Sequence, residues 1–245
     1  AVNLSLRSPS TMIPAIKSNE IEREIFQREL NSFVPDKALD AHAHMWAGIP
    51  NQKNGSGLSP WIEKDMTVTL FHDLMEDLIP RRTIGGLLLA LPMSIHGLPT
   101  TTPDSVTFQA EHIAHQAESD STCKSTMFVS PKLNPDFIRQ EVKRLNIGGL
   151  KCYHTESDRN PTTDSDIPEF LPEEFVRIAD EFGLTVTLHM VKPRAIADPS
   201  NQHWVRTYCK KYPNMKLILA HAARCFNPVW AIEGAASLKG LPNVY

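Results

Sequence analysis

Residues 37–44 read KALDAHAH, a short and mostly apolar segment that ends in two histidines separated by one alanine. The segment is typical of a β-strand, in which residues i and i+2 project to the same side of the sheet. His42 and His44 would then point the same way, so that two neutral ring nitrogens can chelate one divalent cation. Asp40 shares that face and is either an outer partner of the histidines or a plain strand-end carboxylate. Taken alone, the pair is equally typical of two ordinary surface histidines.

The chain alternates apolar segments with amphipathic ones. Strands are predicted over residues 37–44, 83–93, 124–129, 147–153, 184–191 and 216–222, and another begins at 242–245. Helices are predicted over residues 18–33, 65–78, 103–119, 134–145, 172–182, 201–212 and 228–238, and a loop over 46–60. Strands that are apolar nearly throughout indicate a parallel sheet buried on both faces. This alternation fits an open doubly wound sheet as well as a closed barrel.

Two further histidines decide between these folds. His189 ends the predicted strand LTVTLH and His221 ends the predicted strand KLILAH. In parallel barrels the functional groups collect at the C-terminal strand ends, where the βα loops open. One such histidine is more often a packed core residue, but three strands that each deliver one favour a shared site. We therefore predict an α/β fold, a TIM-type (β/α)8 barrel of which six units and the start of a seventh are present.

Length, charge and cysteine usage bound the function. The 245 residues match one such barrel, with an N-terminal arm and helix expected over residues 1–35 and the barrel domain over 36–245. The net charge of -3 gives no basic surface for nucleic acid or an anionic membrane, which favours a small-molecule substrate. No apolar run is long enough to span a membrane. The cysteines form no CxxC pair, which favours a reducing, cytoplasmic location; they are Cys123, Cys152, Cys209 and Cys225.

The segments that carry the histidines resemble a known group of enzymes. DAHAH at residues 40–44, LHM at 188–190 and AHAAR at 220–224 are similar to motifs of the amidohydrolase superfamily. Within it, the sequence most resembles amidohydrolase family 2, which holds metal-dependent hydrolases and nonoxidative decarboxylases. The resemblance runs from about residue 38 to 245, and its motifs are more specific for a metal site than for a substrate.

The resemblance implies a role for each histidine. His42, His44 and His189 would bind a divalent metal, with Zn²⁺ the first candidate and Mn²⁺ or another cation also compatible. His221 would bind a second metal in binuclear relatives, and in mononuclear ones it would contact the substrate or the metal-activated water. The family completes its site with an aspartate after an eighth strand, which residues 1–245 do not contain. We expect either that the sequence is truncated at its C-terminus or that a partner chain supplies the missing strands.

Four more residues are candidates for substrate binding. Lys151 is either a carboxylated lysine that bridges two metals, as in binuclear relatives, or a cation that holds a substrate carboxylate or a nearby acid. His154 reaches the barrel mouth or lies in a loop. Arg224 grips a substrate carboxylate in a bidentate manner or forms a salt bridge at a helix start. Trp46 lines the pocket or packs the loop.

The remaining titratable residues favour structural roles. Cys152 is expected in the core, and Asn227 before Pro228 is expected to cap a helix. His96 follows the second predicted strand and is a weak candidate for the mouth. Four histidines fall on predicted helices and are expected at the surface or in packing contacts: His72, His112, His115 and His203.

The expected reaction is hydrolysis of an amide, ester or lactone of a small organic acid, in which a metal-activated water attacks and His221 moves a proton. One alternative is a lyase, a metal-dependent nonoxidative decarboxylase on the same site. Another is a barrel that binds metal or ligand without turnover. The sequence leaves a homo-oligomer open, and loop substitutions decide between such chemistries more than the fold does.

Overall fold

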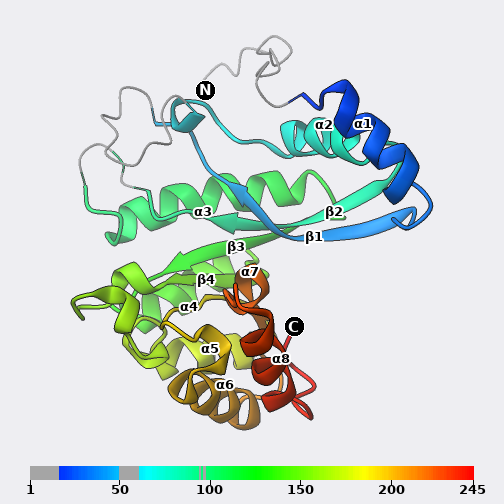
Figure 1. The fold of residues 1–245 in the computed structure, drawn as a ribbon. Coiled ribbons are helices and arrows are strands. Elements are labelled where there is room, and N and C mark those ends of the chain that lie inside the picture. The colour runs from blue at the N-terminus through cyan, green and yellow to red at the C-terminus, as the bar shows by residue number, and fades with distance from the viewer. Residues whose placement is uncertain (1–16, 50–60, 94, 96–97) are drawn as a thin grey trace, which may run out of the picture.

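The computed structural model describes residues 17–49, 61–93, 95 and 98–245 (Figure 1). Most of the predicted N-terminal arm, most of the predicted loop over residues 46–60, and His96 lie outside this part of the chain. Within the described residues, no helix combines the length and apolar character that crossing a membrane requires.

Six parallel strands form one sheet in the order of the sequence, curled into part of a barrel. They are β1 (Lys37–Met45), β2 (Thr83–Ala90), β3 (Lys124–Val129), β4 (Gly149–Tyr153), β5 (Thr185–His189) and β6 (Lys216–Leu219). The backbone N–H of Leu217 donates to Asn243 O, and that of Tyr245 donates to Leu217 O, each at 2.8 Å. A further parallel strand therefore begins beside β6, as the sequence predicts.

Helix α1 precedes β1, and the other helices follow the strands, as expected of (β/α) units. They are α1 (Glu20–Ile25), α2 (Val68–Leu78), α3 (Pro103–Glu118), α4 (Pro135–Arg144), α5 (Glu173–Phe182), α6 (Pro199–Lys211), α7 (Ala220–Ala223) and α8 (Pro228–Ser237). Figure 1 shows α2 and α3 beside β1 and β2, and α4, α5, α6 and α8 on the other side of the strands in that view. The sheet is thus lined by helices along its outside.

Side-chain caps explain where several helices begin. The side chains of Thr67, Thr102, Asn134 and Asp198 each accept a hydrogen bond from a backbone N–H in the first turn of the helix that follows. The predicted cap Asn227 is confirmed, because its Oδ1 accepts from the second and third residues of α8. These contacts satisfy N–H groups that have no partner inside a helix.

One face of the sheet packs against the helices as a row of apolar residues. Met127, Leu150, Val186 and Leu217 are register partners on β3, β4, β5 and β6, and all are buried. The next residue on each strand points to the opposite, inner face of the sheet. On β4 that residue is Lys151, which is fully buried. The strand pattern therefore separates an apolar helix-facing side from an inner side that carries polar groups.

Several predicted boundaries are wrong by a few residues. The predicted helix over 18–33 is α1 followed by a π-helical turn, Phe26–Leu30. The predicted strand over 83–93 ends at Ala90, before the turn residues that follow. The polar stretch after β4 contains three short 3₁₀ turns in place of one loop. The predicted ends rest on apolar content alone. The observed ends also depend on hydrogen-bond partners that the sequence does not reveal.

Candidate metal and active site

His42 and His44 project from the end of β1. The register shifts from Asp40 opposite Gly86 to Ala43 opposite Leu88, so two residues of β1 oppose one of β2. This is a β-bulge, a feature that re-aims side chains near functional sites. Asp40 Oδ1 accepts a hydrogen bond from the His42 backbone N–H at 2.8 Å, and so holds the bulge.

The two imidazoles face each other across a short gap. His42 Nε2 and His44 Nε2 lie 3.2 Å apart. Two nitrogens bound to one tetrahedral Zn²⁺ at about 2.0–2.1 Å would lie about 3.4 Å apart. The separation therefore matches a pair of ligands on one cation, and it also matches a hydrogen bond between neutral tautomers.

His189 lies at the end of β5, and His154 follows the neighbouring strand β4. Tyr153, the last residue of β4, is the register partner of His189 on β5, and their ring centroids are 5.6 Å apart. His154 begins the 3₁₀ turn after β4, and its ring lies 5.5 Å from that of His189. A contact of 3.0 Å between His154 Nδ1 and Thr162 Oγ1 holds the ring in place.

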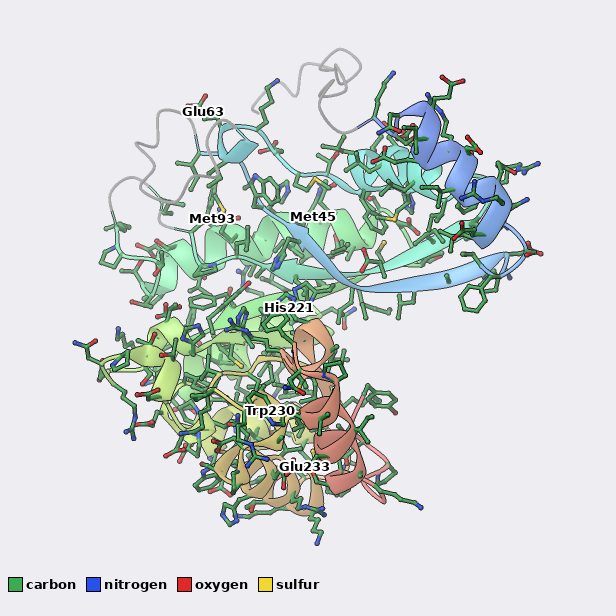
Figure 2. The ribbon with its side chains drawn as sticks, viewed as in Figure 1. Met45, Glu63, Met93, His221, Trp230 and Glu233 are labelled. Carbon is green, nitrogen blue, oxygen red and sulfur yellow. The ribbon has the colours of Figure 1, made fainter. Side chains whose placement is uncertain are left out.

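His221 does not end a strand, which corrects the prediction. β6 stops at Leu219, and the backbone then turns through four consecutive residues with positive φ: His221 (58°), Ala222 (50°), Ala223 (56°) and Arg224 (53°). Non-glycine residues rarely adopt this left-handed conformation, and such strain gathers at functional sites. Figure 2 shows His221 at the junction between the strands and α8, whose Trp230 and Glu233 lie farther from the strands.

The left-handed turn places His221 between the other histidines. Its ring centroid lies 4.5 Å from that of His42 and 5.0 Å from that of His189. β1 and β6 are separated by four strands, so in a flat sheet they would be about 24 Å apart. The contact between His42 and His221 therefore requires a sheet that curls back on itself.

Arg224, from the same turn, reaches the third predicted ligand. Its Nη1 donates a hydrogen bond to His189 Nε2 at 3.3 Å. Among the described residues, the nitrogens of His42, His44 and His189 do not all lie within 4.8 Å of one another. The structure thus brings His42 and His44 into ligand spacing and places His189 close by, with Arg224 on its Nε2.

Lys151 is the charged centre of the inner face. Its side chain is 0% exposed, its Nζ lies 4.7 Å from the ring centroid of Tyr153, and no hydrogen-bond partner for Nζ is present in the described structure. Burial lowers the pKa of Lys151 to about 8. A buried ammonium without a partner costs free energy, so its retention points to a role.

Burial and positive charge keep the imidazoles neutral. Burial first, and then the charge of Lys151, lower the pKa of His42 and His44 to about 4 and that of His189 to about 3. The pKa of His221 is lowered for the same reasons. Neutral rings at neutral pH have free lone pairs, which is the form that binds a metal ion or accepts a proton.

The site has buried polar atoms that lack hydrogen-bond partners. His44 Nδ1, His189 Nδ1 and Lys151 Nζ are buried and have no hydrogen-bond partner in the part of the chain that the structure describes. Buried polar atoms are seldom left unpaired without a functional reason. The donor set of imidazole nitrogens suits Zn²⁺ and similar transition metals. The residues present therefore fit a divalent cation held on the β1 side of the cluster.

The other predicted residues fall into structural surroundings. Trp46 Nε1 donates to Lys64 O at 2.9 Å, and its ring packs against a small apolar cluster, so its role in substrate binding stays a prediction. Cys152 is fully buried, as expected, and all four cysteines are free thiols. His115 and His203 are exposed, and His112 contacts Met66 O at 2.9 Å.

Tyr153 is a site residue that sequence reasoning missed. Its ring packs against His189 and lies over Lys151, and its hydroxyl donates to Ala90 O at 3.3 Å, which ties β4 to β2. The available signal was spacing, because Tyr153 lies two residues after Lys151 and so shares its face of the strand.

Comparison with known proteins agrees with this fold. No family model matches the sequence. The probable dihydroorotase of Schizosaccharomyces pombe is 24% identical over 164 residues, which cover 64% of this chain and 48% of that protein. The chain therefore spans about half the length of this curated relative.

Among solved structures, one hydratase shares the architecture of this chain. The 4-oxalomesaconate hydratase of Rhodopseudomonas palustris matches with a TM-score of 0.52 at 11% identity, covering 84% of this chain and 72% of the hydratase. The dihydroorotase of Saccharomyces cerevisiae in complex with 5-fluoroorotic acid matches with a TM-score of 0.36 at 20% identity, covering 55% and 39%. The likeness to the hydratase supports the fold of a partial (β/α)8 barrel that the sequence predicts.

Proposed function

We propose that this chain forms the metal-binding portion of an amidohydrolase-type hydrolase that acts on an amide, ester or lactone of a small organic acid. The observation that carries the proposal is the convergence of His42, His44, His189 and His221. They come from three distant segments, and all have a lowered pKa. A histidine cluster of this kind at the C-terminal strand ends is what metal-dependent barrel enzymes require.

His42 and His44 would hold the cation, with His189 as the third ligand. The 3.2 Å separation of the two Nε2 atoms supports the pair, and the unpaired Nδ1 of His189 supports the third. Zn²⁺ is the first candidate because three nitrogen ligands leave it one open position. When bound, the cation would supply Lewis acidity toward a substrate carbonyl and a water molecule.

His221 would move the proton. It is the exposed member of the cluster, so a substrate or water can reach it, and its lowered pKa leaves it neutral and able to accept a proton near pH 7. The left-handed turn fixes its ring between His42 and His189, which limits the directions from which the proton is taken. We assign it the role of general base, and then of general acid toward the leaving group.

Two cations would recognise a carboxylate on the substrate. Lys151 lies buried on the inner face, and Arg224 lies in the turn after β6, where it donates a hydrogen bond to His189. The guanidinium has five N–H donors, of which one is directed at His189, so others can reach an anion. Arg224, Lys192 and Phe226 also line a cavity of about 280 Å³, which suits part of a small organic acid.

The experiment is an assay of the chain loaded with Zn²⁺ or Mn²⁺ against small cyclic amides and lactones that carry a carboxylate. Release of titratable acid is expected, and His221→Asn should abolish it. His203→Asn, which changes an exposed histidine of α6, is the control and should retain activity. Release of CO₂ without new acid would favour a decarboxylase instead, and metal binding without either product would favour a binding protein.

A further inference from the structure

A second group of metal-ligating side chains lies away from the histidine cluster. His72 is on α2, while Asp120 and Cys123 belong to the turn between α3 and β3. One ligand atom from each of these residues lies within 4.8 Å of the other two. Cys123 immediately precedes Lys124, the first residue of β3, so this group lies at the N-terminal strand ends, whereas the histidines lie at the C-terminal ends.

The three ligand atoms are close enough to reach one cation. Asp120 Oδ2 contacts His72 Nε2 and also lies 3.8 Å from Cys123 Sγ. A sulfur and an oxygen bound to one tetrahedral Zn²⁺, at about 2.3 Å and 2.0 Å, would lie about 3.5 Å apart. The sulfur–oxygen pair is therefore within a few tenths of an ångström of that spacing, while His72 Nε2, now in direct hydrogen-bond contact with Oδ2, would move away from it to admit a cation.

The surrounding turn orients the aspartate toward the other two residues. Asp120 Oδ1 accepts hydrogen bonds from the backbone N–H and the hydroxyl of Thr122, each at 2.8 Å. The Cys123 N–H donates to Asp120 O at 3.0 Å, which closes the turn. With Oδ1 occupied, Oδ2 is the oxygen that faces His72 and Cys123. Outer contacts of this type orient the ligands of protein metal sites.

We infer that His72, Asp120 and Cys123 form a structural site for a divalent cation of the zinc class, with a fourth position open to water. A thiolate together with an imidazole favours Zn²⁺ over Mg²⁺ or Ca²⁺, which prefer oxygen ligands. On binding, the thiol proton of Cys123 passes to solvent and a sulfur–metal bond forms. The cation would join α2 to the α3–β3 turn, and so add a link to the existing contact between His72 and Asp120.

This inference does not depend on the proposed function, and its test separates the two. The probe is Co²⁺ added to the variant His42→Ala/His44→Ala, which lacks the strand-end pair. A thiolate-to-cobalt absorption band is expected, because the strand-end histidines include no sulfur. Adding Cys123→Ser should remove the band. Adding Cys209→Ser should leave it, since Cys209 is buried to a similar degree (3% exposed, against 2%) but lies on α6.

Thermal unfolding of the same background gives a second readout. Zn²⁺ should raise its melting temperature, because a ligand that binds only the folded state stabilises it. His72→Gln should abolish the rise; this side chain is 39% exposed, so the change is compatible with folding. His115→Gln, on the exposed side of α3, should preserve it. The absence of a sulfur band, a band that survives Cys123→Ser, or a rise that survives His72→Gln would each overturn the inference.

Discussion

At the scale of single residues, Lys151 explains the electrostatics of the site. It is fully buried on the inner face of β4, and its charge contributes to the lowered pKa of His42, His44, His189 and His221. Removing an ammonium group from water costs on the order of several kcal/mol unless partners repay it. The same residue therefore lowers the stability of the fold and keeps the imidazoles in the form that binds a cation.

Replacing this lysine should separate stability from function. We expect Lys151→Met, which conserves volume and removes the charge, to raise the free energy of unfolding by about 1 kcal/mol or more. It should also abolish turnover of carboxylate substrates. Urea denaturation measures the first effect, with Lys210→Met on the exposed side of α6 as a neutral control. If Lys151→Met instead lowered the free energy of unfolding as much as a substitution that leaves a cavity in the core, the proposed cost of the buried charge would be contradicted.

At the scale of elements, the left-handed turn after β6 positions His221 and Arg224. Its four residues with positive φ carry side chains, and each costs roughly 1–2 kcal/mol relative to right-handed backbone. The turn persists because its two ends are held, by the parallel pairing of β6 and by the cap of α8. The strained backbone of this turn directs the side chains of His221 and Arg224 toward the same site.

Ala222→Gly tests that strain. Glycine adopts positive φ without penalty, and the exposed Ala222 methyl loses little packing. We expect the free energy of unfolding to stay constant or to rise by about 1 kcal/mol. Ala236→Gly on the exposed side of α8 is the matched control and should lose about 1 kcal/mol, as is normal inside a helix. Equal losses in both variants would show that the turn is unstrained.

The contact between α4 and α3 gives a pH-dependent prediction. Hydrogen bonds from Arg144, at 2.9 Å and 2.6 Å, hold the pKa of the nearly buried Glu141 below its ordinary value of 4.5. A lowered carboxyl pKa adds stability that is complete above the unfolded value and is lost as the pH falls through the folded value. Glu141 also accepts from Thr107 on α3 at 3.2 Å.

Glu141→Gln should therefore lower the free energy of unfolding by about 1–2 kcal/mol at pH 7. The difference from the parent chain should shrink as the pH falls below 4.5, where the carboxylate of the unfolded parent chain takes up a proton before that of the folded chain. Denaturation across a pH series measures this. Glu111→Gln, whose half-exposed side chain also contacts Arg144, is the control and should change stability by less than about 1 kcal/mol. A difference that is constant with pH would contradict the assignment.

The sequence predicted the features that depend on local pattern. The six strands, the cap at Asn227 and the positions of His42 and His189 at strand ends follow from hydrophobic period and residue type. The turn at His221 could not be predicted, because Ala-His-Ala-Ala has no glycine and favours a helix. The bulge at Asp40 depends on pairing with β2, and the contact of Arg224 with His189 depends on the turn. Both are consequences of tertiary structure.

At the scale of the whole molecule, the site exists only because the sheet curls. His42 lies on β1 and His221 in the turn after β6, 179 positions apart in the sequence and at the two outer strands of the six, yet their rings are 4.5 Å apart. No single (β/α) unit contains more than part of the cluster. The inner face is therefore a product of the complete strand order, and a variant that flattened the sheet would lose the site without any change in its residues.

The most direct test of this account is a crystal structure of the chain with Zn²⁺, analysed by anomalous scattering at the zinc edge. We expect a peak within bonding distance of His42 Nε2 and His44 Nε2, with a ring nitrogen of His189 directed toward it. His42→Ala/His44→Ala should lose this peak and keep any peak beside Cys123. Crystals that bind zinc but show no density between His42 and His44 would contradict the central claim.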